Sequence, residues 1–227
     1  MPPLIEVCVD SLDSALTAQA LGADRLELCA NLPIGGTTPS PGLLRLARER
    51  VSLPLHVLVR PRGADFVYSP AEIETMLADI AFAKEAGADA IVCGALTFDR
   101  RIDKDITRTL IAASAPLPFT FHRAFDVCVQ PLEALRVLTG LGVARVLTSG
   151  QAPSAAQGLP LLRECMQASG RVIIMPGGGI TPDNMRAVLA LRPAEIHFSG
   201  TVRVGERLVL EAERLEGMIR VVRESEP

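Results

Sequence analysis

The sequence lacks an excess of positive charge and any long apolar run. Its 227 residues hold 23 Lys and Arg against 26 Asp and Glu, a formal net charge of −3. Proteins that neutralise the phosphates of a nucleic acid need a basic surface, so this balance predicts no nucleic-acid partner. No stretch approaches the roughly 20 consecutive apolar residues that cross a bilayer, so we expect no membrane partner either.

The sequence also lacks a secretory leader pattern and closely spaced cysteines. The first residues carry no basic segment, and Glu6 and Asp10 stand early, which predicts a cytoplasmic protein. The five cysteines, at positions 8, 29, 93, 128 and 165, are odd in number and form no CxxC pair. This spacing indicates neither a disulfide framework nor a zinc ribbon, so we expect free thiols.

What the sequence does have is a regular alternation of short apolar runs with helical patterns. The expected strands are Leu4–Val9, Arg25–Cys29, Leu55–Arg60, Ala90–Cys93, Phe119–His122, Arg145–Leu147, Arg171–Met175 and Glu195–Phe198. Helix start signals stand between them at Ser11, Ser40, Ser69 and Thr181, the last three each followed by proline. The strands recur about every 27 residues, the length of one strand-helix unit of a parallel sheet.

Eight such units predict a closed barrel. No linker or shift in composition divides the chain, so we expect residues 1–227 to form a single (β/α)8 TIM barrel of the α/β class. The barrel is expected over residues 1–200, with a closing C-terminal helix over about 206–223. A doubly wound open sheet is the alternative, but the first strand-helix turn, Val9 to Leu12, has none of the glycines of a dinucleotide site.

The expected barrel interior is unusually polar. With a period of two, the inward positions of four strands are Glu6 and Cys8, then Arg25, Glu27 and Cys29, then His56, Leu58 and Arg60, then Thr120 and His122. A purely structural barrel fills these layers with Val, Ile and Leu. Two interpretations stay open: a functional site, or a buried network in which the two glutamates pair with the two arginines.

The loop after the third expected strand begins Arg60-Pro61-Arg62. A guanidinium group holds carboxylate or phosphate oxygens through paired hydrogen bonds, so two arginines on a turn stiffened by proline predict an anionic ligand. For Arg62 alone, a surface ion pair with Asp65 is an equal alternative.

The loop after the fifth expected strand reads His122-Arg123-Ala124-Phe125-Asp126. Histidine exchanges a proton near neutral pH, and the arginine and aspartate beside it can bind an oxyanion and fix the imidazole tautomer. The candidate catalytic residues are therefore Glu27, His122 and Asp126. The alternative is a histidine satisfied within the barrel beside an ion pair.

Glycines follow the seventh expected strand, and a serine follows the eighth. Such glycines let backbone N–H groups approach an anion, and these two loops often bind phosphate in barrels, although glycines serve tight turns as well. The candidate anion-binding residues are Arg25, Arg60, Arg62, Arg123, Gly177, Gly178, Gly179 and Ser199.

Sulfur atoms end three of the expected strands. Cys29, Cys93 and Met175 close the second, fourth and seventh strands, and thiolate and thioether ligands select Cu(I). Because cysteine is also common as a small buried hydrophobic residue, packing in the core is the alternative.

Taken together, these motifs resemble those of the CutC copper homeostasis family. The resemblance is carried, in order over nearly the whole expected barrel, by Ile5–Cys8, Arg25–Cys29, Gly35–Ser40, Arg60–Arg62, Asp65–Ser69, Phe121–Asp126, Leu147–Gly150 and Gly177–Gly179. The family usually has a glycine directly before the aspartate of the arginine loop, where this chain has Ala64. The resemblance implies a cytoplasmic TIM barrel that forms a homo-oligomer, with a Cu(I) site whose cysteines map to Cys29 and Cys93.

Three functions are open at this point. The resemblance implies a copper homeostasis protein that binds Cu(I) at the C-terminal mouth of the barrel. The alternative is an enzyme without a metal, a lyase, isomerase or hydrolase, in which His122 or Glu27 moves a proton and the arginines hold a small anionic or sugar-like substrate. A scaffold or oligomeric binding protein is the third, and it requires the polar interior to be structural only.

Overall fold

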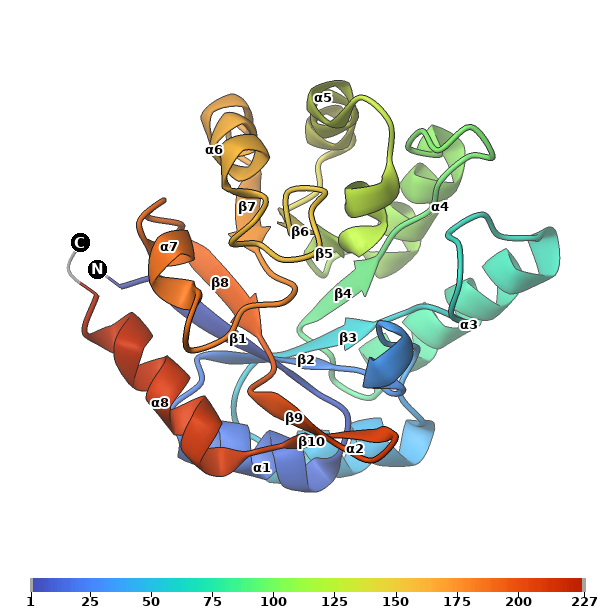
Figure 1. The fold of residues 1–227 in the computed structure, drawn as a ribbon. Coiled ribbons are helices and arrows are strands. Elements are labelled where there is room, and N and C mark those ends of the chain that lie inside the picture. The colour runs from blue at the N-terminus through green and yellow to red at the C-terminus, as the bar shows by residue number, and fades with distance from the viewer. Residues whose placement is uncertain (1, 226–227) are drawn as a thin grey trace.

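The eight expected strands pair in parallel around a barrel, with helices on its outer side (Figure 1). The structure is a computed structural model and describes residues 2–225. The strands are β1 (Leu4–Val9), β2 (Arg25–Leu28), β3 (Leu55–Leu58), β4 (Ala90–Cys93), β5 (Phe119–Phe121), β6 (Arg145–Thr148), β7 (Ile173–Pro176) and β8 (Glu195–Phe198). The helices are α1 (Leu12–Ala20), α2 (Pro41–Arg50), α3 (Pro70–Glu85), α4 (Lys104–Ser114), α5 (Pro131–Leu141), α6 (Leu159–Ala168), α7 (Met185–Leu189) and α8 (Ala212–Arg223).

Each strand pairs with its neighbour in the sequence, and β1 also pairs with β8, so the sheet runs from β7 through β1 to β8. The remaining gap, between β7 and β8, is bridged by a single parallel contact between Gly177 and His197. A Cβ atom at position 177 would lie 2.5 Å from Leu147 Cδ1 and 3.0 Å from His197 Cβ, so the absence of a side chain allows this close approach. The prediction of a single TIM barrel is confirmed, with a barrel that is nearly closed.

Several helices begin at the residues that the start signals predict. The Ser40 hydroxyl accepts a hydrogen bond from the Leu43 N–H, and Ser69 forms a capping box with Glu72. The signal at Thr181 is followed by a turn, and α7 begins only at Met185. The side chain of Asn184 accepts from the Thr181 N–H in that turn, which delays the helix by a few residues.

The last expected helix begins later than position 206. Residues 201–210 form an antiparallel hairpin of β9 (Thr201–Val204) and β10 (Arg207–Leu210), and α8 starts at Ala212. Alternating apolar residues on both sides of Gly205, which has φ of +60°, favour this hairpin over a helix. The predicted start of the closing helix was therefore wrong, because the hairpin occupies the first part of the predicted span. The hairpin lies beside the barrel mouth, where β10 contacts the short turn Leu32–Ile34 that follows β2 (Figure 1).

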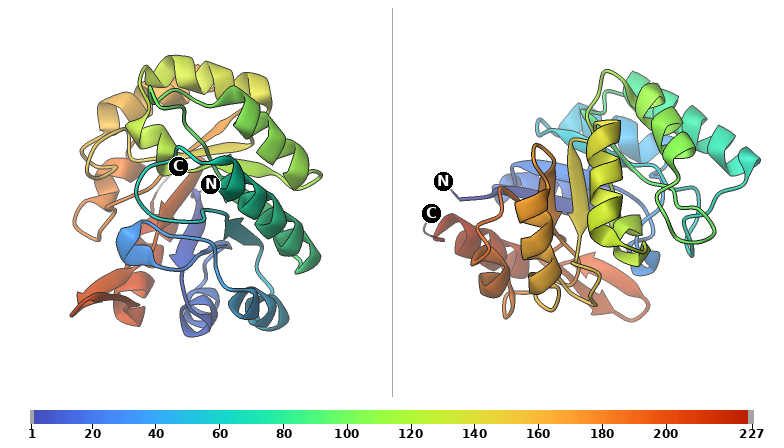
Figure 2. Two further views of the ribbon diagram at one scale, coloured as in Figure 1. Left: turned by 90° about the vertical axis from the view of Figure 1, so that its right-hand side faces the viewer. Right: turned by 90° about the horizontal axis from the view of Figure 1, so that it is seen from above.

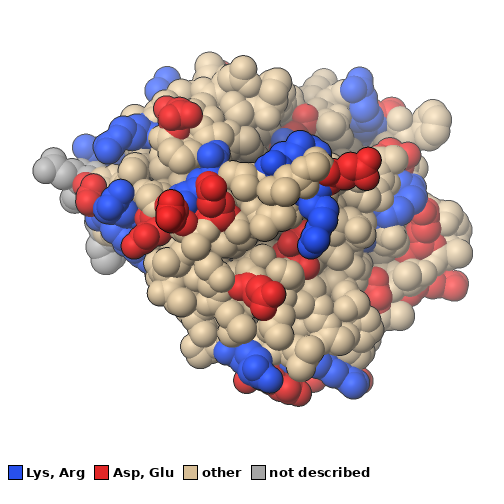
Figure 3. Space-filling view, turned by 60° about the horizontal axis from the view of Figure 1, so that its bottom comes forward, with Lys and Arg blue, Asp and Glu red and all other residues tan. Residues whose placement is uncertain are grey.

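The apolar core lies mainly between the strands and the surrounding helices, which Figure 2 shows packed around the barrel from two sides. The inside of the barrel is different: it holds a small separate apolar cluster of Cys8, Cys29, Leu58 and Val92 together with most of the buried charged residues. On the face shown in Figure 3, basic and acidic side chains are interspersed over the surface. Among residues 2–225, no helix combines the length and apolar character that crossing a membrane demands.

Candidate functional site

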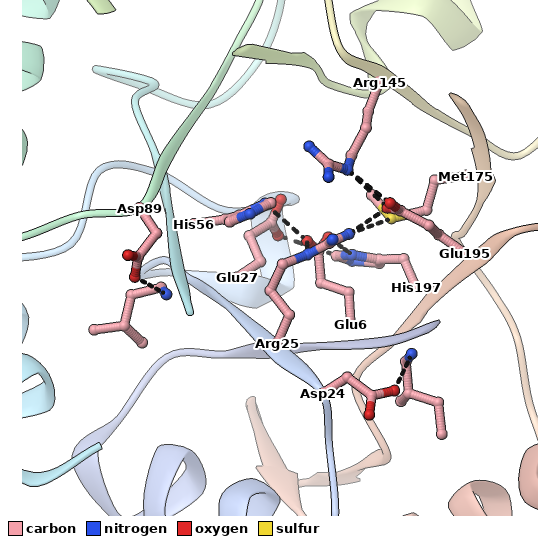
Figure 4. A network of polar contacts seen from close by, with 12 residues as sticks. Glu6, Asp24, Arg25, Glu27, His56, Asp89, Arg145, Met175, Glu195 and His197 are labelled. Atoms are coloured by element: carbon pink, nitrogen blue, oxygen red, sulfur yellow. Dashed lines mark hydrogen bonds and ion pairs between the residues drawn. The ribbon is translucent and has the colours of Figure 1, made fainter. Parts of the chain in front are cut away.

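The lower part of the barrel interior holds a network of paired charges (Figure 4). Arg25 Nε lies 2.5 Å from Glu6 Oε2, and Arg25 Nη2 lies 2.5 Å from Glu195 Oε2. Arg145 Nε contacts the same Glu195 oxygen at 2.8 Å. Arg25, Arg145 and Glu195 each begin their strand, so this network sits at the end of the barrel opposite the mouth. Both carboxylates compensate the buried charge of Arg25, which is a structural role rather than the anion-binding role expected for it.

Glu6 connects this network to the layer above. Its Oε1 lies 2.8 Å from His197 Nδ1, and its Oε2 lies 3.0 Å from His56 Nδ1. Burial raises the pKa of Glu6, but the two histidines and the Arg25 guanidinium outweigh this and hold the pKa well below its ordinary value. Glu6 is therefore a buried carboxylate ion that orients the His197 ring and lies beside His56.

Three possible metal ligands come together above Glu6. Cys8, Glu27 and His197 offer one ligand atom each, and these atoms all lie within 4.8 Å of one another. The Cys8 thiol donates a hydrogen bond to Glu27 Oε2 at 3.0 Å, and His197 Nε2 lies 3.8 Å from the same oxygen. The β1 and β2 register, which places Cys8 beside Glu27, accounts for the contact between these two. Sequence reasoning singled out Glu27 but not Cys8 or His197 as site residues, although the period of two already placed Cys8 inward.

Burial and mutual contact shift all three groups. Burial raises the pKa of Glu27, and the negative charge of Glu6 raises it further. The attraction of His197 lowers this pKa but offsets the rise only in part. The neighbouring Cys29 thiol and burial raise the pKa of Cys8 well above its usual value, which keeps the thiol protonated. Burial lowers the pKa of His197, but Glu27 and Glu6 raise it by more. The cluster therefore holds protons that an incoming cation can displace.

The sulfur atoms predicted to meet at the mouth are divided between different parts of the barrel. Cys29 Sγ lies 3.6 Å from Cys8 Sγ, inside the barrel. Cys93 packs in the outer core instead, where burial raises its pKa to about 12, and the inner cluster holds its neighbour Val92. Met175 Sδ accepts from Arg25 Nη2 at 3.4 Å, in the lower network. Cys29 thus finds a second cysteine, but that partner is Cys8 and not Cys93.

A cavity of about 360 Å³ opens at the barrel mouth beside the Cys8, Glu27 and His197 cluster. The predicted site residues that line it are Glu27, Arg60, His122, Arg123, Gly178, Gly179 and Ser199. The predicted residues that do not line it are Arg25, Arg62, Asp126, Gly177, Cys29 and Cys93. The structure therefore brings together about half of the candidates around one space.

Arg60 is fixed against the wall of this cavity. Its Nη1 donates to Ile34 O at 3.1 Å and to Gly36 O at 2.9 Å, and its Nη2 donates to Ala64 O at 2.9 Å. The guanidinium carbon lies 4.7 Å from the centre of the Phe66 ring. Only 4% of the residue is exposed, so Arg60 is a buried cation held by neutral groups.

Arg62, two residues further on, has a different role. Its five N–H groups are all used within the chain, on Glu72, on Asp65 and on the carbonyl oxygens of residues 63, 65 and 67. These contacts support the alternative of a local ion pair for Arg62. Ala64 in the same loop has φ of +67°, the left-handed conformation that a glycine adopts more readily.

His122 occupies the cavity wall next to Arg60. Its Nδ1 accepts a hydrogen bond from the Ala124 N–H at 3.3 Å, which places the ring proton on Nε2. The ring packs edge-on against Phe66, with 4.9 Å between the ring centres. Burial and the charge of Arg60 lower the pKa of His122 to about 3. The ring is therefore neutral, and it is suited to donating a hydrogen bond rather than to taking up a proton.

Arg123 and Asp126 form a pair at the rim. Asp126 accepts from Arg123 Nε at 2.8 Å, from the Thr148 hydroxyl at 2.5 Å and from the Ser149 N–H at 3.0 Å. These bonds hold the loop after β6 and orient Arg123, whose side chain is 45% exposed. Asp126 is therefore a positioning residue beside the cavity, because its oxygens are already occupied.

The glycine loop after β7 lets Arg123 lie close to the backbone. A Cβ atom at Gly178 would come within 2.8 Å of Arg123 Cζ, and Gly178 has φ of +92°. The Ser199 hydroxyl, which also lines the cavity, shares a hydrogen bond with the Thr201 hydroxyl at 2.9 Å. These small residues leave the mouth open around Arg123.

Comparison with known protein families agrees with this arrangement. The model of the CutC family matches residues 3–202, which is the whole barrel. The chain belongs to the CutC family. The CutC relatives include the human "Copper homeostasis protein cutC homolog", 54% identical over 187 residues, which cover 82% of this chain and 68% of the human protein. A CutC protein of Bacteroides thetaiotaomicron is 49% identical over 197 residues, covering 86% and 79% of the two chains.

Solved structures agree as well. A structure described as CutC from Streptococcus agalactiae superposes with a TM-score of 0.82 at 32% identity and covers 88% of this chain and 99% of its own. A phosphoribosyl anthranilate isomerase from Thermus thermophilus superposes with a TM-score of 0.62 at 21% identity, covering 95% and 96% of the two chains. At that identity, the isomerase shows only that the CutC barrel shares its fold.

Proposed function

We propose that the protein binds Cu(I) at the inner end of the cavity, through Cys8, Cys29 and His197. The observation that carries this proposal is the position of the buried Cys8 thiol, whose sulfur lies 3.6 Å from Cys29 Sγ and within 4.8 Å of a ring nitrogen of His197. Sulfur ligands select Cu(I) over harder cations, and imidazole is a suitable further ligand. Relatives that carry the name of copper homeostasis proteins support the choice of metal.

The surroundings of His197 support a ligand role. Metal-binding histidines usually donate their second N–H to a carboxylate, which fixes the tautomer and leaves the other nitrogen for the metal. Glu6 Oε1 stands 2.8 Å from His197 Nδ1, so a proton kept on Nδ1 leaves Nε2, the nitrogen nearer to Glu27, to hold a metal ion that displaces its proton. Glu27 accepts a hydrogen bond from the Cys8 thiol and is placed to compensate the charge of a bound cation.

The test is an anaerobic titration with Cu(I) against a competing chelator. The wild-type chain is expected to bind one ion. In a Cys8→Ser, Cys29→Ser double variant the Cu(I) affinity is expected to fall by more than roughly 10–100-fold, the loss that follows removal of a residue that only orients a ligand. Cys93→Ser is the matched control, because this buried thiol lies in the outer core. Equal affinity in the double variant and the control would exclude this site.

A second function is favoured by one observation. Glu27 lines the cavity, and its raised pKa suits a group that exchanges protons with a bound molecule. In this alternative the protein is a lyase, isomerase or hydrolase, and Glu27 rather than the neutral His122 moves the proton. Two separate variants distinguish the functions: the Cys8→Ser, Cys29→Ser variant removes the proposed copper ligands, and Glu27→Gln removes the proposed catalytic group. Turnover that survives loss of both thiols but not of Glu27 would identify an enzyme.

The cytoplasmic location and the homo-oligomer belong to the same proposal. Both rest on the resemblance of the sequence to the CutC family. Sedimentation of the purified chain measures the assembly, and a monomer at micromolar concentration would contradict this part of the proposal. Fractionation of cells that produce the protein measures its location.

A further inference from the structure

The cavity is larger than a copper site requires. Its volume of about 360 Å³ falls within the range of roughly 300–1,000 Å³ that is usual for small-molecule sites. Cys8, Glu27 and His197 occupy only its inner end. The remaining wall contains apolar side chains, among them Leu58, Phe66, Leu147 and Phe198, which suit the carbon skeleton of an organic molecule.

The charged residues of the wall favour an anion. Three arginines line the cavity, Arg60, Arg123 and Arg214, against a single carboxylate, Glu27. Within residues 2–225, Arg60 is bound only by carbonyl oxygens and by the face of Phe66, whereas the equally buried Arg25 is paired with two glutamates. A buried cation without a carboxylate partner is costly, so an anionic group of a ligand is stabilised most strongly beside Arg60.

A hydrogen-bond donor beside Arg60 points to the same conclusion. His122 Nε2 is buried, carries the ring proton, and has no hydrogen-bond partner among the described residues. An unpaired buried donor costs about 1–3 kcal/mol, so an acceptor brought by a ligand would remove that cost. Phe66 contacts both side chains, Arg60 by its face and His122 by its ring edge, and so holds the two donors side by side.

We propose that the cavity binds a small organic oxyanion, a phosphate ester or a carboxylate, whose oxygens contact Arg60 and Arg123 and accept a hydrogen bond from His122 Nε2. The apolar wall holds the carbon skeleton, and the Cys8, Glu27 and His197 cluster faces its far end. This binding site does not rest on the proposed copper site, since the oxyanion is held by different side chains.

The first experiment uses inorganic phosphate as the probe on the copper-free chain. At constant ionic strength, phosphate is expected to raise the melting temperature in a saturable manner, because it binds the folded state only. Arg60→Gln is expected to weaken phosphate binding by about 10–100-fold, in line with the loss of a charged hydrogen-bond partner. Arg62→Gln, in the same loop but outside the cavity, is the matched control and is expected to bind like wild type.

Further variants keep the test decisive if Arg60→Gln does not fold. Arg123→Gln changes a half-exposed side chain and is expected to weaken phosphate binding about tenfold. Cys29→Ser removes a thiol that the copper proposal uses but that does not line the cavity, so it is expected to keep the full phosphate response, which separates this proposal from copper binding. The proposal is overturned if phosphate gives no saturable shift, or if Arg60 and Arg123 variants respond as strongly as the Arg62 variant.

A second experiment identifies the ligand class. Glycerol 3-phosphate and glycerate present a phosphate ester and a carboxylate on the same carbon skeleton, and glycerol is their neutral control. One of the two anions is expected to bind more tightly than inorganic phosphate or acetate, and its crystal complex is expected to show an oxygen on His122 Nε2. If neither binds more tightly than inorganic phosphate and acetate, or if that nitrogen carries only water, binding of a larger organic ligand is excluded and the site holds an adventitious ion only.

Discussion

Glu6 and His197 are joined across neighbouring strands by a contact of 2.8 Å between Oε1 and Nδ1. Through its other oxygen, Glu6 also pairs with Arg25. One carboxylate therefore joins the structural network at the barrel base to the candidate metal cluster of Cys8, Glu27 and His197. The orientation of the proposed ligand His197 depends on an ion pair one layer below it.

This dependence predicts an indirect effect on copper binding. Glu6→Gln removes the charge that orients His197 and is expected to lower Cu(I) affinity by about 10–100-fold. Glu195→Gln is the control, because Glu195 also pairs with Arg25 but has no contact with His197. Competition titration of both variants measures the difference. A similar loss of affinity in the two would show that the effect comes from general weakening of the barrel.

The two arginines Arg25 and Arg62 are predicted to differ sharply in their contribution to stability. Arg25→Gln leaves the buried Glu6 without its guanidinium partner and Glu195 with Arg145 alone, and it is expected to lower the free energy of unfolding by about 3–5 kcal/mol. Arg62→Gln removes a partly exposed ion pair and is expected to cost no more than about 1 kcal/mol. Urea denaturation of both variants checks this, and equal losses would contradict the structural role assigned to Arg25.

Much of this architecture could be predicted from the sequence because barrels repeat. The spacing of apolar runs located all eight strands, and the period of two placed Glu6, Glu27 and His122 inside the barrel. Cys93 was misplaced toward the mouth because this last residue of β4 packs in the outer core, and the inner cluster contains Val92 instead. Pairing across strands, such as that of Cys8 with Cys29, depends on register, which one strand read alone does not reveal.

The arginine loop shows a second limit. Sequence alone left the alternatives for Arg62 balanced. Three of its N–H groups donate to backbone carbonyl oxygens of its own loop, and the directions of those carbonyl groups depend on the turn. The hairpin of β9 and β10 was missed for a related reason. Its residues are compatible with either state, and pairing with each other decides between them.

Ala64 is predicted to be a site where glycine stabilises the chain. Its φ of +67° is strained for an alanine, and relief of that strain by Ala64→Gly is expected to raise stability by up to about 1 kcal/mol. Ala81→Gly is the matched control: it makes the same change in an exposed interior turn of α3 and is expected to lower stability by roughly 0.5–1 kcal/mol. Chemical denaturation measures both. The same sign in both variants would show that the conformation at position 64 is not strained.

The last prediction concerns the pH dependence of stability that arises from His122. Burial and Arg60 lower the pKa of this ring from 6.5 to about 3, so the folded chain keeps it neutral while the unfolded chain protonates it below pH 6.5. Because the unfolded state then binds more protons, stability falls as the pH falls. Between pH 7.5 and 5 the ring does not titrate in the folded chain. Over this pH range it lowers the free energy of unfolding by about 2 kcal/mol.

Replacing the ring isolates this contribution. His122→Phe is expected to show a pH dependence that is flatter by about 2 kcal/mol between pH 7.5 and 5, whatever its stability at neutral pH. Thr120→Val, a change at a buried hydroxyl of the same strand segment that does not titrate, is expected to keep the wild-type slope. Urea denaturation at several pH values gives the slopes. A wild-type slope in His122→Phe would mean that the ring is protonated in the folded chain near neutral pH, and it would restore His122 as a candidate general acid.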